Sequence, residues 1–119
     1  MRRLSPAVTW SISIFLALLF AAVGASKIWG ASATSWSARL SNWGLPAGSR
    51  YVIGVVEMAG GLALFLPRTR KLAAASLVVT MAGALAVHLI HGELLRVIPP
   101  LILGFLSFLL FYSAPSAEH

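Results

Sequence analysis

Long apolar runs separated by short polar segments constrain the fold of this chain more than any other feature. Four such runs cover about residues 7–29, 51–66, 72–90 and 97–112. Charged residues make up 10% of the 119 residues, whereas a soluble domain carries about a quarter. So few charges cannot cover a water-soluble globule of this size. The pattern predicts an all-α integral membrane protein, a four-helix bundle that forms a single transmembrane domain.

The first run is long enough to cross a bilayer. Trp10 and Trp29 stand near its ends, about 28 Å apart along a helix, close to the thickness of the hydrocarbon core. Arg2 and Arg3 followed by an apolar stretch also resemble a cleaved signal peptide, but the stretch is long for one. We therefore expect a retained transmembrane helix.

The segment between the first two runs, residues 30–50, is polar and rich in Ser, Ala and Trp. Trp36, Leu40 and Trp43 recur at helical spacing, and Gly44 offers an end to such a helix. This pattern predicts a short helix lying in the membrane interface, with Trp36 and Trp43 as interfacial residues. An ordinary loop with interfacial tryptophans is an equally good interpretation.

The basic residues between the runs indicate the orientation of the chain. The formal net charge is +6, but the cations form no stripe and no groove-reading motif, so no nucleic-acid partner is expected. With four spans, one side of the membrane receives two short basic segments, which contain Arg2, Arg3, Arg68, Arg70 and Lys71. The positive-inside rule then predicts that both termini are cytoplasmic.

One carboxylate falls inside the second apolar run, where a charge without a partner is costly. Glu57 lies about 10 Å from the predicted outer end of this span. Gly54, Gly60 and Gly61 share its helix face, and Gly24 belongs to a small-residue stripe of the first run. These glycines are candidate helix-packing positions, because small residues let membrane helices approach closely. Glu57 is therefore expected to face protein.

Side chains from the same outer half are candidate partners of Glu57. Lys27 ends the first run and His88 lies near the outer end of the third. These three residues form the predicted polar pocket, with His91 and Arg96 as possible additional members. A plainer interpretation is that Lys27 snorkels to the interface, His88 bonds a backbone carbonyl and Glu57 only locks the bundle.

Several chemistries have no support in the sequence. The chain has no Cys, which excludes disulfides, thiolate metal sites and cysteine nucleophiles. His88, His91 and Glu93 make a loose H-x-x-H-x-E cluster, but no firm fourth ligand accompanies it. We therefore predict no metal site, and no Gly-rich phosphate loop or Ser-His-Asp arrangement is found.

The order of several short motifs resembles that of DoxX-like membrane proteins. They are GASK at 24–27, WGLP at 43–46, GVVEMAGG at 54–61, PRTRKLAA at 67–74 and the stretch 84–88. Each motif is weak alone, but together they cover nearly the whole chain in the expected order.

The resemblance implies a small four-helix membrane protein of a mostly bacterial family, whose Lys, Glu and His positions match Lys27, Glu57 and His88. Some relatives are described as subunits of quinone-linked or redox-stress oxidoreductase complexes. We therefore expect an accessory subunit in a bacterial plasma membrane, leaning to no activity alone, with a pocket for a quinone or another amphipathic molecule. The alternatives are an assembly partner or chaperone that uses the segment around Trp36 and Trp43, and a small oligomeric transporter.

Overall fold

The structure, a computed structural model, describes residues 4–30, 32–46 and 48–113. The described residues form five α-helices and a short 3-10 helix: α1 (Pro6–Ile28), α2 (Ser32–Asn42), α3 (Ser49–Ala63), α4 (Pro67–Ile90), η1 (Leu94–Val97) and α5 (Ile98–Ser113). The predicted all-α class is confirmed. A short helix, α2, stands between the first two apolar helices, where the sequence was equally compatible with a short helix and with a loop.

Three segments are long and apolar enough to cross a bilayer, namely α1, α4 and the stretch Leu94–Ser113. The predicted span at residues 51–66 corresponds to α3, which is too short to cross the hydrocarbon core by itself. Its 15 residues extend about 22 Å, whereas the core is about 30 Å thick. The N–H groups of Leu64, Phe65 and Leu66 each bond to the carbonyl three residues back. These tighter turns extend the helical path of α3 as far as α4.

The basic segment after α3 is helical, which corrects the prediction of a turn ahead of a span starting at Leu72. Helix α4 begins at Pro67, because proline has the φ of the first helical position and needs no N–H there. Thr69 Oγ1 donates to the carbonyl of Ala63 at 2.8 Å, and Arg70 Nε donates to that of Leu64 at 2.9 Å. Side chains of the first turn of α4 therefore cap the end of α3.

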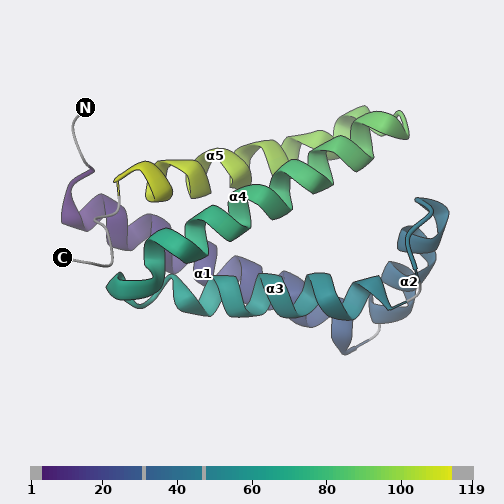
Figure 1. The fold of residues 1–119 in the computed structure, drawn as a ribbon, viewed down its shortest axis with the longest axis horizontal. Helices are drawn as coiled ribbons and strands as arrows, with labels where there is room; N and C mark the ends of the chain where they lie inside the picture. The colour runs from purple at the N-terminus through teal and green to yellow at the C-terminus, as the bar shows by residue number, and fades with distance from the viewer. Residues whose placement is uncertain (1–3, 31, 47, 114–119) are drawn as a thin grey trace.

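The long helices form two pairs that diverge along the length of the molecule (Figure 1). Helix α1 packs against α3, and α4 packs against α5. The pairs meet near the α3–α4 turn, at the end where α1 begins and α5 finishes. The buried apolar core joins the two pairs. It includes Leu16, Ala17 and Phe20 of α1, Leu64 directly after α3, Ala73, Ala74, Leu77 and Met81 of α4, and Leu110 of α5. At the opposite end the pairs separate, and α2 lies across the end of α1 and α3.

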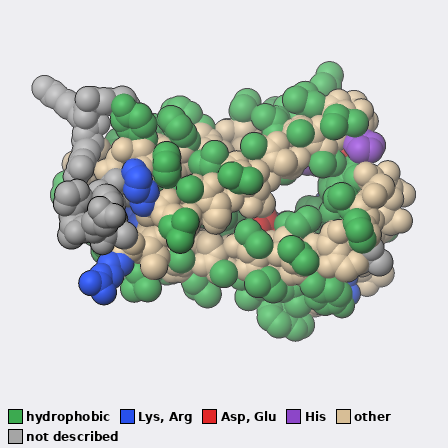
Figure 2. Space-filling view, viewed as in Figure 1, with side chains coloured by type: hydrophobic (Ala, Val, Ile, Leu, Met, Phe, Trp, Pro, Cys, Tyr) green, Lys and Arg blue, Asp and Glu red, His purple; other side chains and the backbone are tan. Residues whose placement is uncertain are grey.

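The outer surface is apolar. Large hydrophobic side chains such as Phe15, Leu72, Val79 and Phe105 are more than half exposed, and hydrophobic side chains spread over much of the visible face in Figure 2. A surface of this kind suits lipid chains, which impose no cost on exposed apolar groups.

Glycines bring the backbones of α1 and α3 into contact. A Cβ atom at Gly24 would lie 2.6 Å from the carbonyl oxygen of Gly54, and one at Gly54 would lie 2.8 Å from that of Gly24. A Cβ at Gly61 would meet the carbonyl of Ala17 at 3.0 Å, and one at Gly60 would meet Leu77 of α4 at 3.0 Å. The residues that follow Gly24 and Gly54 by one helical turn are thereby held face to face.

Candidate functional site

A buried ion pair joins α1 to α3 one turn beyond the contact between Gly24 and Gly54. Lys27 Nζ lies 2.5 Å from Glu57 Oε1, and the two side chains are 6% and 3% exposed. The close approach of the two backbones lets these side chains meet. Because hydrocarbon cannot solvate a carboxylate, the ammonium group supplies the compensation that Glu57 needs.

Two further groups hold Lys27 in place at the end of α1. The ammonium lies 4.2 Å from the centroid of the Trp36 ring on α2, a cation–π contact. The guanidinium of Arg50 donates to the carbonyl of Lys27 at 2.9 Å, where positive charge suits the C-terminus of a helix. Arg39 also approaches Trp36, at 5.0 Å. Trp36 therefore lies against two cations beside the ion pair.

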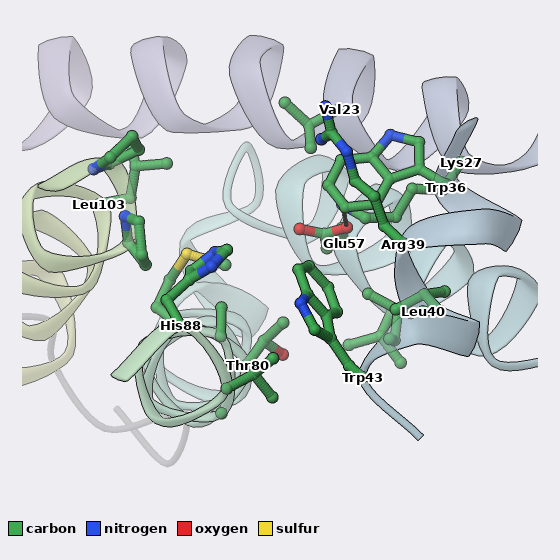
Figure 3. A pocket seen from close by; sticks show the side chains of 18 of the residues that line it. Val23, Lys27, Trp36, Arg39, Leu40, Trp43, Glu57, Thr80, His88 and Leu103 are labelled. Atoms are coloured by element: carbon green, nitrogen blue, oxygen red, sulfur yellow. Dashed lines mark hydrogen bonds and ion pairs between the residues drawn. The ribbon is translucent and has the colours of Figure 1, made fainter. Parts of the chain in front are cut away.

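The ion pair lies in the wall of a cavity of about 600 Å³ between the two helix pairs (Figure 3). Most of the lining is apolar; its tryptophans and its charged and polar members are Lys27, Trp36, Arg39, Trp43, Glu57, Thr80, His88 and Arg96. In Figure 2 the hollow opens on the visible face, between the helix pairs, and an acidic side chain shows at its edge. The opening faces sideways from the long axis of the molecule.

A second polar cluster faces the cavity from the end of α4. Gly92 has a φ of +71°, a left-handed conformation that favours glycine. The N–H of Glu93 donates to the carbonyl of His88 at 2.8 Å, which completes a Schellman motif. This turn folds Glu93 back over His88, so that Glu93 Oε1 lies 2.9 Å from His88 Nδ1. Arg96 NH1 lies 3.4 Å from Glu93 Oε2.

Trp43 connects α2 to this second cluster. Its Nε1 donates to Glu93 Oε1 at 3.2 Å, and its ring meets the His88 ring edge-on, with centroids 5.3 Å apart. Trp43 stands where α2 ends, before Gly44 with a φ of +80°, and the N–H of Leu45 returns to the carbonyl of Leu40 at 2.9 Å. Two Schellman motifs therefore place the groups that bridge the wide end of the molecule.

The charge state of Glu93 follows from its neighbours. The hydrogen bond from His88 holds the pKa of Glu93 below its usual value, and Arg96 and Trp43 act in the same direction against partial desolvation. Glu93 is therefore a carboxylate at neutral pH and can only accept hydrogen bonds.

Lys27, Glu57 and His88, predicted to form one polar pocket, line the same cavity but belong to two separate polar clusters. Lys27 and Glu57 contact each other. His88 lines the same cavity, but its partner is Glu93 rather than the ion pair. Arg96 also lines the cavity. His91 is exposed, and its Nδ1 lies 2.9 Å from the carbonyl of Val87, so it stands apart from the pocket.

Glu93 was not predicted as a partner of His88 in the pocket, although both residues belong to the H-x-x-H-x-E cluster. The available signal was Gly92 directly before it, since a helix-ending glycine returns the next residue to the preceding turn. Trp36 and Trp43, predicted as interfacial residues, are half-buried and line the cavity. Among the residues that the structure describes, no three His, Asp or Glu side chains converge as metal ligands would.

Comparison with known proteins gives one match. No curated protein and no solved structure matches the chain. A family model, that of the DoxX-like family, matches residues 11–110, a range that contains both polar clusters and the cavity between them. Together with three helices able to cross a bilayer, the match indicates an integral membrane protein. On the extent of this match, the chain belongs to the DoxX-like family.

Proposed function

We propose that this protein binds an amphipathic small molecule of the quinone type between its helix pairs. We further propose that it serves as an accessory subunit of a membrane oxidoreductase complex in a bacterial plasma membrane, with four crossings and both termini cytoplasmic. The observation that carries the proposal is the ion pair of Lys27 and Glu57 in the wall of an apolar cavity.

The cavity has the size and chemistry of a ligand site. Its volume, about 600 Å³, falls in the range of small-molecule pockets, which are mostly apolar with a few placed polar groups. Lys27 can donate to a carbonyl oxygen of a ligand head, and Glu57 can accept from a hydroxyl. The sideways opening admits an apolar tail from the bilayer. The accessory role is proposed from the sequence resemblance alone, because some DoxX-like relatives are described as subunits of oxidoreductase complexes.

The ion pair is a poor device for stability alone. Replacing a buried pair with apolar residues of similar size is often neutral or stabilising, whereas removing one partner costs about 3–5 kcal/mol. If the ion pair serves binding, apolar residues in its place should preserve the fold but abolish ligand binding. The double variant Lys27→Met with Glu57→Leu separates these two roles.

Fluorescence of Trp36 and Trp43 provides the binding test, since both rings line the cavity. We would place the protein in lipid nanodiscs, replace Trp10 and Trp29 with Phe, and titrate a short-chain benzoquinone as a quencher. The wild-type pocket should give saturable quenching, and the double variant should lose about tenfold or more in affinity, as expected when charged hydrogen-bonding groups are removed.

Two controls decide the interpretation. Thermal unfolding of the double variant shows that it is folded, and Arg68→Gln, an exposed charge at the other end of the molecule, should leave quenching unchanged. If the double variant binds the quinone as the wild type does, the pair is only structural and the proposal is wrong.

The accessory role has its own test. Mild-detergent extraction from the native membrane should recover the chain with a stoichiometric subunit that carries a redox cofactor. Recovery of the chain alone, with saturable quinone binding intact, would keep the pocket and remove the accessory role.

A further inference from the structure

We propose that Glu93 is a positioning residue of the pocket, which holds His88 in the Nδ1-protonated form so that its Nε2 accepts a hydrogen bond from a protic ligand head. This inference rests on the proposed function and adds a preference for ligands of this type whose polar head carries a hydroxyl, as a phenol or a hydroquinone does.

The tautomer of His88 follows from its partner. Glu93 Oε1 lies 2.9 Å from His88 Nδ1. An ionised carboxylate has no proton to donate, so Nδ1 must carry the hydrogen of this bond. In a neutral imidazole the other nitrogen is then bare and accepts a hydrogen bond. Carboxylates fix histidine ligands of metal sites in the same way.

The backbone builds this arrangement. The left-handed Gly92 returns the chain so that the N–H of Glu93 bonds to the carbonyl of His88. The carboxylate is therefore tied to His88 both through the backbone and through the side chain. Trp43 donates to the same Oε1 at 3.2 Å, and Arg96 approaches the other oxygen at 3.4 Å. These contacts leave Glu93 little freedom to turn away from the ring.

The remaining nitrogen of His88 is left for a ligand. The His88 side chain is 14% exposed and lines the cavity. In Figure 3 it projects from α4 into the space that Glu57 faces from the other side. Within the described part of the chain, no side chain or backbone group is recorded as a hydrogen-bond partner of Nε2. The ring is held by Trp43 along its edge, which keeps this nitrogen in the cavity wall.

Polar and charged groups surround this position on both walls of the cavity. Those that face Glu93 are His88 from α4, Trp43 from the end of α2 and Arg96 from η1. Across the cavity stand the paired Lys27 and Glu57, which supply a donor and an acceptor of their own. A head that meets both walls gains hydrogen bonds at two places.

Nitrogen-15 NMR of labelled histidine measures the tautomer without any ligand. The chain has three histidines, so a background with His91→Asn and His119→Asn leaves only the His88 signals. At a pH of about 8, where an unperturbed histidine is neutral, we expect Nδ1 to be protonated and Nε2 bare in the full chain in nanodiscs. Glu93→Ala should shift the ring toward the Nε2-protonated form, and Arg96→Ala should not.

The spectrum of the protein with His88 and Glu93 intact tests the proposed tautomer even if the Glu93→Ala variant misfolds. A ring protonated at Nε2, whether neutral or fully charged, would overturn the proposal. So would a folded Glu93→Ala protein with an unchanged tautomer.

A matched pair of ligands tests the consequence for binding. A decyl-substituted phenol and its methyl ether differ by one hydrogen-bond donor. The wild type should prefer the phenol, and both Glu93→Ala and His88→Phe should reduce that preference about tenfold, the value of one good hydrogen bond. An unchanged preference in Glu93→Ala contradicts the positioning role. If neither compound binds the wild type or either variant, the proposed function is wrong, whereas the tautomer measurement still tests the positioning of His88 by Glu93.

Discussion

At the scale of residues, the two carboxylates of the pocket are stabilised in different ways. Glu57 is 2% exposed and meets a full positive charge on Lys27. Glu93 is partly exposed and accepts from Trp43 and His88, with Arg96 3.4 Å from its other oxygen. A charge deep in hydrocarbon needs an opposite charge, whereas one near the membrane surface is satisfied by hydrogen bonds and water. The two acids should therefore respond differently to substitution and to pH.

The contribution of Glu93 to stability should depend on pH. Because its pKa is lower in the folded protein than its usual value of about 4.3, its contribution is present in full above that value. It is lost as the pH falls through the lower, folded pKa. We expect the Tm difference between wild type and Glu93→Gln to be constant above about pH 4.3 and to shrink below it. A difference that grew on acidification would contradict this assignment.

The contact between Gly24 and Gly54 leaves no room for a methyl group. In Gly24→Ala the new Cβ would lie 2.6 Å from the carbonyl of Gly54 and 2.8 Å from the amide of Met58, so α1 and α3 must move apart. We expect a loss of about 1–3 kcal/mol, the usual cost of overpacking, measured by unfolding in detergent. Gly83→Ala is the matched control, because a Cβ there meets nothing within 4 Å. Equal losses in both variants would mean that glycine at position 24 is not required for packing.

At the scale of elements, the ends of helices place the side chains that matter for the outer wall. Helices α2 and α4 both finish in Schellman motifs, with Gly44 and Gly92 in the left-handed region. The first motif presents Trp43 and the second presents Glu93, and these two side chains bond to each other. The bridge between the two halves is thus built from two helix ends.

Gly92→Ala should weaken this bridge. An alanine at a φ of +71° costs about 1–2 kcal/mol, and relief of that strain moves Glu93 away from His88. We expect a lower Tm, measured in nanodiscs, together with a shift of the His88 tautomer toward the Nε2-protonated form. Gly83→Ala, in the regular part of α4, should not lower the Tm, because alanine is the better helix former, and should leave the tautomer unchanged. A fall in Tm with an unaltered tautomer would show that the turn does not position Glu93.

The elements were easier to predict than the contacts at their ends. The apolar runs predicted helices because lipid leaves few alternatives for the backbone, and the glycine face around Glu57 predicted that this side chain faces protein. The pairing of His88 with Glu93 depends on a left-handed turn whose effect on side chains is not visible in hydropathy. The early start of α4 was missed because basic residues after Pro67 resemble a loop, although they cap α3.

At the scale of the whole molecule, the cavity results from two helix pairs that join firmly at one end only. The apolar core lies where the pairs meet, and the bridge through Trp43 and Glu93 spans the other end. A ligand between the pairs would add contacts where the protein has few of its own. Binding to the folded state alone should then raise stability by mass action.

The number of membrane crossings decides on which side of the membrane the α3–α4 turn lies. With four crossings, the α3–α4 turn and the start of α1 share one side, and α2 lies on the other, as the arrangement of helix ends in Figure 1 allows. If the short helix α3 does not cross, the α3–α4 turn lies on the side of α2. Because the chain has no Cys, single introduced thiols report these positions without interference.

We expect Ser41→Cys on α2 to react with a membrane-impermeant maleimide from outside intact cells. Ser5→Cys, before α1, and Arg68→Cys, at the start of α4, should react only after the membrane is opened. All three side chains are exposed, so equal labelling in detergent serves as the control for reactivity. Labelling of Arg68→Cys from outside, together with Ser41→Cys, would mean that α3 re-enters without crossing. The cations at the start of α4 would then lie outside, and the positive-inside rule would no longer account for the orientation of this protein.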